Sequence, residues 1–223
     1  MTTIEERPVA EVGSPRKRSE DAHLITGQTQ WTDNITLPGM LHLAVLRSPV
    51  AHGRISRVDV TAARERPGVV AAFSGADLAD EWASGLPTAW TVSEDLKTPP
   101  HLPLATDKVR YVGDGIAVVA ATSREAAADA LESISFDLEP LPPVLDMEGA
   151  LADGAPLVHE DVPNNRAFTY TEHHGDYTAA RRRADVVVSR RFINQRLIPS
   201  AIEPRSIVAE PHPATGEYTL WSS

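Results

Sequence analysis

The stretch that most constrains the fold is the apolar run at residues 116–121 together with the residues that follow it. Six consecutive apolar residues are typical of a strand that is buried on both faces. Directly afterwards, residues 122–125 have the pattern of a capping box at a helix N-terminus. One buried helical face is predicted by the spacing of the next apolar residues, Ala127, Ala130, Leu131 and Ile134. The sequence therefore predicts a central strand with a helix packed against it.

More strands surround this pair. Apolar or alternating runs predict them at residues 40–46, 55–60, 69–73 and 135–138. A Leu-Pro-Gly turn at 37–39 introduces the first strand, and a short helix at 61–66 is stopped by Pro67 and Gly68. Helices and strands are mixed without a strict βαβ alternation, so the predicted fold class is α+β.

Two irregular stretches divide the chain. Residues 76–106, the excursion, have no clear period and carry Trp82 and Trp90, which either the same domain or a partner subunit buries. Three prolines at 140–143 then make an extended exit. We therefore expect an N-terminal arm at 1–20, a domain at 21–145, a linker with a short helix at 146–183, and the start of a second domain at 184–223.

The final stretch is predicted to be rich in strands. β-Branched or alternating runs indicate them at 185–192, 206–209 and 217–221, and Pro-Ala-Thr-Gly at 213–216 forms a turn between the last two. An isolated hairpin is only marginally stable in water, so Trp221 needs cover from more chain or from another chain. We expect residues 184–223 to be the truncated beginning of a larger domain.

Composition excludes several classes of protein. The 21 basic and 31 acidic residues give a net charge of −10, which repels nucleic acid. No apolar run reaches the ~20 residues of a membrane span. The charged first residues lack the apolar centre of a signal peptide, which predicts a cytoplasmic protein. The absence of Cys excludes disulfides and iron–sulfur ligation within this segment.

The small motifs that suggest catalysis or metal binding do not have the required context. Gly113-Asp114-Gly115 precedes a strand, so it is interpreted as a tight turn rather than a nucleotide site. The eight histidines include no pair at helical metal-ligand spacing, and no Ser occupies a Gly-x-Ser-x-Gly motif. We therefore predict no catalytic, cofactor-binding or metal-ligating residue within the segment.

One polar group stands out among apolar neighbours: Gln195, Glu203 and Arg205. Charged residues in such surroundings are buried only when they are paired. The interpretation is a structural polar network, with direct substrate contact as the alternative.

Several phrases of the sequence, in the same order, resemble one family. They are LPGMLH at 37–42, RSPVAH at 47–52, LATDKVRYVG at 104–113, EPLPP at 139–143, QRLIP at 195–199, EPR at 203–205 and LWSS at 220–223. The first four are similar to the α/β hammerhead domain of the molybdenum hydroxylases, the xanthine dehydrogenase and aldehyde oxidase family. The others resemble the start of its molybdopterin-binding region, closest to the carbon monoxide dehydrogenase large-chain branch.

The resemblance implies the N-terminal part of a large subunit. The parent enzyme would be an oxidoreductase that hydroxylates an aldehyde, an N-heterocycle or carbon monoxide with water as the oxygen source. It would hold molybdopterin cytosine dinucleotide and pass electrons to iron–sulfur and flavin subunits, whereas this chain alone is expected to bind no cofactor and to be inactive. The family residues that contact the metal and substrate have no counterpart here. The alternative is a free-standing, non-catalytic interaction module that keeps the hammerhead fold.

Overall fold

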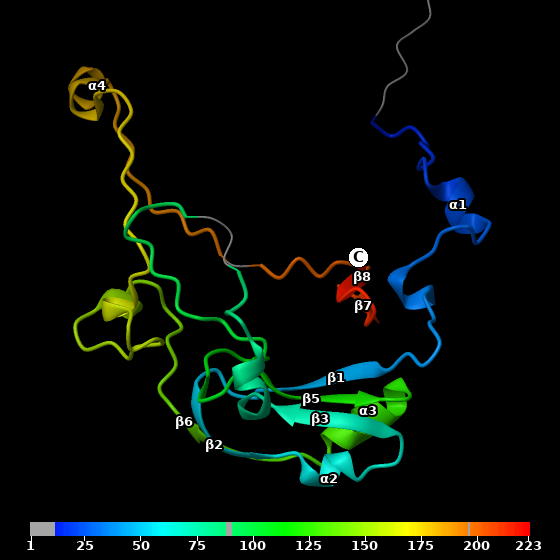
Figure 1. Cartoon of the computed structure of the whole chain (residues 1–223). Helices are drawn as coiled ribbons and strands as arrows, with labels where there is room; N and C mark the ends of the chain where they lie inside the picture. Colours follow the sequence, from blue (N-terminus) through cyan, green and yellow to red (C-terminus); the bar gives the residue numbers. More distant parts are fainter. Residues whose placement is uncertain (1–11, 88–90, 196) are drawn as a thin grey trace, which may run out of the picture. The chain divides into compact units, whose positions relative to one another are not determined.

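The computed structural model describes residues 12–87, 91–195 and 197–223 (Figure 1). The chain forms two compact units. The larger unit is Gly39–Arg190, and the smaller combines Arg191–Ser223 with the described part of Met1–Pro38. Helices and antiparallel sheets occur together, which confirms the α+β class.

A three-stranded antiparallel sheet forms the centre of the larger unit. Its order is β1 (His42–Arg47), β5 (Gly115–Ala121) and β3 (Val69–Ser74), so the predicted central strand is confirmed. Val118 of β5 lies opposite Val45 on one side and opposite Phe73 on the other. The strand begins after a turn in which Gly113 has φ +94°, as expected for Gly-Asp-Gly turn chemistry.

Two helices cover one face of this sheet. α3 (Arg124–Leu131) packs against β1 and β5, and α2 (Thr61–Arg64) packs against β3. Both helices lie on the same side of the sheet in Figure 1. The contact is made largely by fully buried alanines, Ala63, Ala72, Ala117 and Ala130, with Val60, Val119 and Ile134. Because alanine has only one side-chain carbon, the helices approach the sheet closely.

The capping box was predicted one residue too early. Ser123 is the N-cap of α3, and its side chain accepts a hydrogen bond from the backbone N–H of Ala126 at 3.1 Å. Glu125 is therefore the second residue of the helix, not the third, so it cannot complete the reciprocal bond of a capping box.

A second antiparallel sheet joins distant parts of the larger unit. Its order is β4 (Lys108–Val109), β2 (Gly53–Asp59) and β6 (Ser135–Pro140), which confirms the strands predicted at 55–60 and 135–138. Beyond β6, the Leu141 N–H donates to the His52 carbonyl, and a His52 ring nitrogen lies 2.9 Å from the Pro142 carbonyl oxygen. These contacts fix the course of the proline-rich exit.

The described residues of the excursion and the linker form only short helices. η2 (Ala76–Glu81) opens the excursion, η3 (Gly149–Leu151) and η4 (Pro163–Asn165) lie in the linker, and α4 (Tyr177–Arg183) ends it. Asp176 caps α4, because its carboxylate accepts from the Ala179 N–H at 2.8 Å. Trp82 is half-buried, and Trp90 lies outside the described residues.

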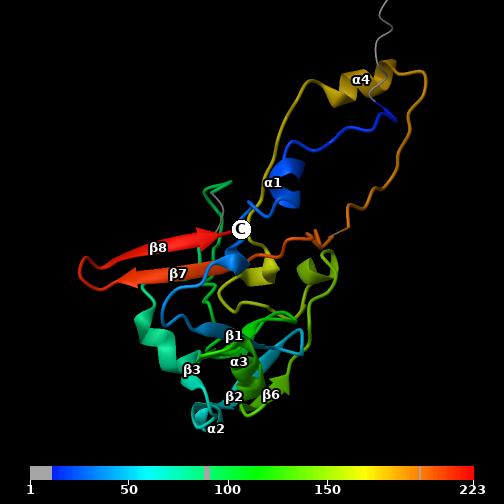
Figure 2. The same ribbon diagram turned by 90° about the vertical axis from the view of Figure 1, so that its right-hand side faces the viewer.

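In the smaller unit the predicted hairpin is confirmed, while the strand predicted at 185–192, near the boundary of the two units, is wrong. β7 (Ile207–His212) pairs antiparallel with β8 (Glu217–Ser222), as Figure 2 shows. Residues 185–192 have no regular secondary structure, because no described strand pairs with them. The remaining helices are α1 (Asp21–Ile25) and η1 (Thr32–Asn34). Trp221 is half-buried, and Tyr218 and Leu220 beside it are exposed.

Candidate functional site

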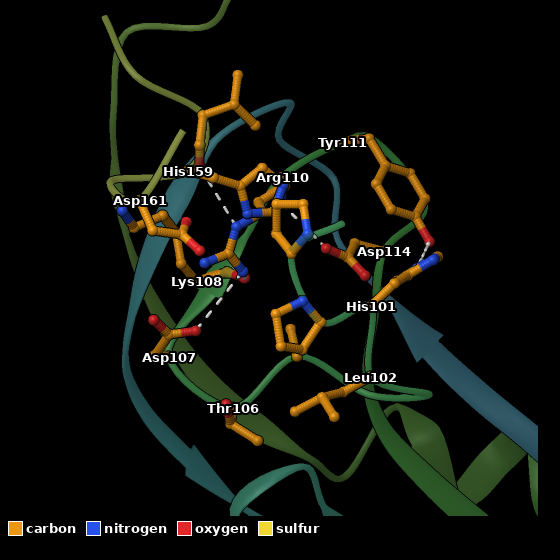
Figure 3. Close-up of a pocket in the computed structure, with 14 residues that line it drawn as sticks. His101, Leu102, Thr106, Asp107, Lys108, Arg110, Tyr111, Asp114, His159 and Asp161 are labelled. Atoms are coloured by element: carbon orange, nitrogen blue, oxygen red, sulfur yellow. Dashed lines mark hydrogen bonds and ion pairs between the residues drawn. The ribbon is translucent and has the colours of Figure 1, made fainter. Parts of the chain in front are cut away.

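The larger unit contains a pocket of about 530 Å³ between the end of the excursion and the linker (Figure 3). This volume is in the range of small-molecule sites. Its walls come from the excursion, β4, the turn after β4 and the linker. Its lining includes polar and aromatic side chains and several apolar ones. The polar and aromatic residues are His101, Asp107, Lys108, Arg110, Tyr111, Asp114, His159 and Asp161, and the apolar residues include Pro99, Pro100, Leu102 and Val158.

A buried lysine lies in one wall. The side chain of Lys108 in β4 is only 4% exposed, and its ammonium pairs with the carboxylate of Glu160, which is 68% exposed. The hydrogen bond from Lys108 is the main reason why the pKa of Glu160 is lowered to about 2. The pair joins residues that are far apart in the sequence and ties the linker to β4.

The guanidinium of Arg110 is also held by the protein itself. Its Nε donates to the Val158 carbonyl at 3.3 Å, and its Nη1 donates to the Lys108 carbonyl at 3.0 Å. Nη1 also lies 3.6 Å from Oδ1 of Asp107. The backbone N–H of Arg110 donates to the buried carboxylate of Asp114 at 3.0 Å.

Two further side chains change their acidity in the pocket. Burial lowers the pKa of the His159 imidazole, and the nearby Arg110 cation lowers it further, so the ring is neutral near pH 7. Burial and the Asp114 carboxylate raise the pKa of the Tyr111 phenol. His101 meets Tyr111 edge to face with ring centroids 6.0 Å apart.

Asn165 holds the linker in shape beside the pocket. Its side-chain oxygen accepts from the Val158 N–H at 2.9 Å, and its amide nitrogen donates to the carbonyls of Ala150 at 3.0 Å and Pro156 at 2.9 Å. Its φ of +52° is a conformation that Asn tolerates better than most residues. One side chain therefore closes the loop that carries Val158 and His159.

We expect Asn165→Ala to destabilise the larger unit by about 2 kcal/mol, since three hydrogen bonds are lost and the half-buried residues Val158 and Ala150 lose a partner for a backbone group. Hydrogen exchange at the Val158 amide measures the loss directly. Asn164→Ala is the matched control, because Asn164 has a similar φ of +54°. Equal effects of the two substitutions would show that backbone conformation, not hydrogen bonding, decides the cost.

The residues of the predicted polar network belong to the smaller unit. Gln195, Glu203 and Arg205 are all exposed, and within the described residues no hydrogen bond or ion pair joins them. Sequence reasoning did not find Lys108, Arg110 and Glu160 as a group. The available signal in the sequence was weak: Lys108 is one of only three lysines.

The part of the chain that the structure describes contains no group of three or more His, Asp or Glu side chains that could hold a metal ion. None of its helices is long and apolar enough to cross a bilayer. The described residues of the stretch 184–206 are all exposed.

Comparison with known families gives two matches along the chain. Residues 26–142 match the sequence model of the aldehyde oxidase and xanthine dehydrogenase a/b hammerhead domain. Residues 158–223 match that of the molybdopterin cofactor-binding domain. The resemblance inferred from the phrases of the sequence is thereby confirmed.

Individual relatives agree. The chain is 33% identical to the nicotine 6-hydroxylase large subunit of Paenarthrobacter nicotinovorans, over 95% of this chain and 26% of that protein. It is 34% identical to the carbon monoxide dehydrogenase large chain of Afipia carboxidovorans, over 95% of this chain and 27% of that protein. The chain thus spans about a quarter of the length of these relatives, which are large subunits or large chains.

Solved structures show the same relationship. Quinoline 2-oxidoreductase from Pseudomonas putida 86 matches with a TM-score of 0.83 and 34% identity, over 92% of this chain and 26% of that one. A copper- and molybdenum-containing carbon monoxide dehydrogenase matches with a TM-score of 0.77 and 34% identity, over 94% of this chain and 27% of that one. The chain therefore belongs to the aldehyde oxidase and xanthine dehydrogenase family, with an α/β hammerhead domain followed by part of a molybdopterin cofactor-binding domain.

Proposed function

We propose that this chain is the N-terminal segment of the large subunit of a molybdenum hydroxylase and that it serves there as scaffold and subunit contact. The complete enzyme would oxidise an aldehyde, an N-heterocycle or carbon monoxide and take the inserted oxygen from water. Relatives named for nicotine, quinoline and carbon monoxide support this range of substrates. No catalytic step is assigned to a residue of this segment.

Cofactor, partners and location are part of the same proposal. Molybdopterin cytosine dinucleotide is the proposed cofactor form, held by the complete cofactor-binding domain. Iron–sulfur and flavin subunits are the proposed electron acceptors, which fits relatives that are named as subunits of complexes. We keep the cytoplasm as the proposed location. We also propose the domain division predicted from the sequence: an arm at 1–20, the hammerhead domain at 21–145, a linker at 146–183 and the start of the cofactor-binding domain at 184–223. Family matches at 26–142 and 158–223 support it.

The main support for a role as scaffold and subunit contact is the exposure of many large apolar side chains to solvent. In the larger unit, Leu43 is 70% exposed and Phe73 is 38% exposed on the face of the β1–β5–β3 sheet opposite α3. Phe192 is 90% exposed and Ile202 is 104% exposed in the irregular stretch before β7. Large apolar side chains exposed in this number, in each unit taken by itself, support a role in packing against other polypeptide.

We expect Phe192→Ser to have a small effect on the stability of the 223-residue chain and a large effect on the stability of the complete large subunit. In the 223-residue chain the side chain is already exposed, so the free energy of unfolding changes by less than about 0.5 kcal/mol. In the complete large subunit the same change should cost about 3 kcal/mol, because a covered Phe is lost. Denaturant unfolding of both proteins measures this. An unchanged complete subunit would remove the support for a contact role.

Metal analysis tests the proposal that molybdenum is bound by the complete large subunit and not by this segment alone. We expect the complete large subunit to carry stoichiometric molybdenum and the isolated 223-residue chain to carry none and to have no hydroxylase activity. Elemental analysis of both purified proteins measures it. Molybdenum on the isolated chain would contradict the proposed division of labour, and a complete protein without molybdenum would favour the non-catalytic interaction module.

A further inference from the structure

The two cations that line the pocket already have partners within the protein. The Lys108 ammonium pairs with Glu160. The Arg110 guanidinium donates to the Val158 and Lys108 carbonyls and lies beside Asp107. The Lys108 ammonium is therefore not available to an anionic ligand unless its bond to Glu160 breaks, and two nitrogens of the Arg110 guanidinium are already engaged.

The acceptors, in contrast, remain open to the pocket. The Asp107 side chain is 66% exposed, and the Asp161 side chain is also exposed. Both appear on the same side of the pocket in Figure 3, with Asp114 on the other side. His159 contributes a neutral imidazole there, because burial lowers its pKa.

The balance of charge has a definite sign. Two cations, Lys108 and Arg110, face three lining carboxylates, and Glu160 adds a fourth beside Lys108. The local charge is negative while the positive groups are paired. A positively charged group that enters is attracted by the excess of carboxylates.

The remaining surface suits an apolar body. Pro99, Pro100, Leu102 and Val158 supply apolar walls. Tyr111 is 46% exposed and its ring stands edge to face with His101. Aromatic faces attract organic cations. Volume, acceptors, charge and aromatic lining thus all favour the same class of ligand.

We propose that this pocket of the hammerhead domain binds a small organic cation: an amidinium, a guanidinium or a protonated nitrogen heterocycle with an apolar body. Asp107 and Asp161 supply the acceptors, and Tyr111 supplies an aromatic surface. This inference does not depend on the proposed function, since it concerns residues of the larger unit alone.

The test uses the complete enzyme complex and three probes of one shape and different charge. Benzamidinium is cationic, benzamide is neutral and benzoate is anionic. We expect benzamidinium to bind with saturation by calorimetry, benzamide to bind about tenfold more weakly and benzoate not to bind. The readout is binding, so it stays separate from hydroxylase activity. Equal affinity for benzamide or benzoate would overturn the proposal.

Variants place the binding in this pocket. We expect the double variant D107N/D161N to bind benzamidinium about tenfold more weakly and Tyr111→Leu about threefold more weakly. Asp129→Asn is the matched control, because it removes the same charge from the exposed surface of α3, outside the pocket lining. Unchanged affinity in the double variant and in Tyr111→Leu would show that benzamidinium binds elsewhere. No saturable binding to the complex would also refute the inference.

Discussion

Replacing Ile116 by alanine is expected to lower the free energy of unfolding of the larger unit by about 3 kcal/mol. Ile116 is fully buried in β5, the central strand of the β1–β5–β3 sheet. The substitution removes three side-chain carbons and leaves a cavity that the neighbouring strands cannot close, because β5 is paired on both edges. Urea or guanidinium unfolding followed by circular dichroism measures the change.

Leu43→Ala provides the control for Ile116. It also removes three carbons from a strand of the same sheet, but the Leu43 side chain is 70% exposed. In the 223-residue chain its cost should stay below about 0.5 kcal/mol. Similar costs for the two substitutions would mean that Ile116 is not part of a closely packed core.

The second large effect is expected at the pair of Lys108 and Glu160. Glu160→Ala leaves the Lys108 ammonium 4% exposed and without its partner. Removing one member of a buried pair costs several kcal/mol, and we expect about 2 kcal/mol here because Glu160 itself is 68% exposed. Thermal or denaturant unfolding of the larger unit measures it.

A double-mutant cycle separates the ion pair from packing. Lys108→Met keeps most of the buried volume and removes the charge, so it should cost less than Glu160→Ala. The double variant K108M/E160A should then be more stable than Glu160→Ala alone, because no unpaired charge remains buried. Additive costs would show that the two side chains do not interact.

The same pair gives a dependence on pH with a definite sign. The pKa of Glu160 is about 2 in the folded protein, below its ordinary value of 4.5. Its contribution to stability is therefore fully present above about pH 4.5 and is lost as the pH falls toward 2. We expect the stability of Glu160→Ala to fall less steeply than that of the original protein across this window.

Local patterns in the sequence predicted much of the fold. The run at 116–121 predicted the central strand correctly, because a strand buried on both faces is apolar throughout. The spacing of Ala127 and Ala130 predicted the buried face of α3, because helical burial has a fixed period. The hairpin of β7 and β8 followed from two runs around a turn with Gly216 at φ +75°. The family followed from the order of its short phrases.

Features that depend on distant partners could not be predicted in this way. The run at 185–192 has the composition of a strand, but a strand also needs a neighbour to pair its backbone, and the described chain offers none. Lys108 and Glu160 meet across 52 positions of sequence, so no local spacing indicates their contact. The pocket could not be predicted either, because its lining residues come from separate stretches of the sequence.

The alanine-lined contact between α2, α3 and the sheet has a consequence for how such a domain can change over generations. Ala63, Ala72, Ala117 and Ala130 are almost completely enclosed, so each position has no spare volume for a larger residue. Gains in size there must be matched by losses at a facing position. The interior is therefore expected to drift through compensating pairs, while the solvent side of α3 changes one residue at a time.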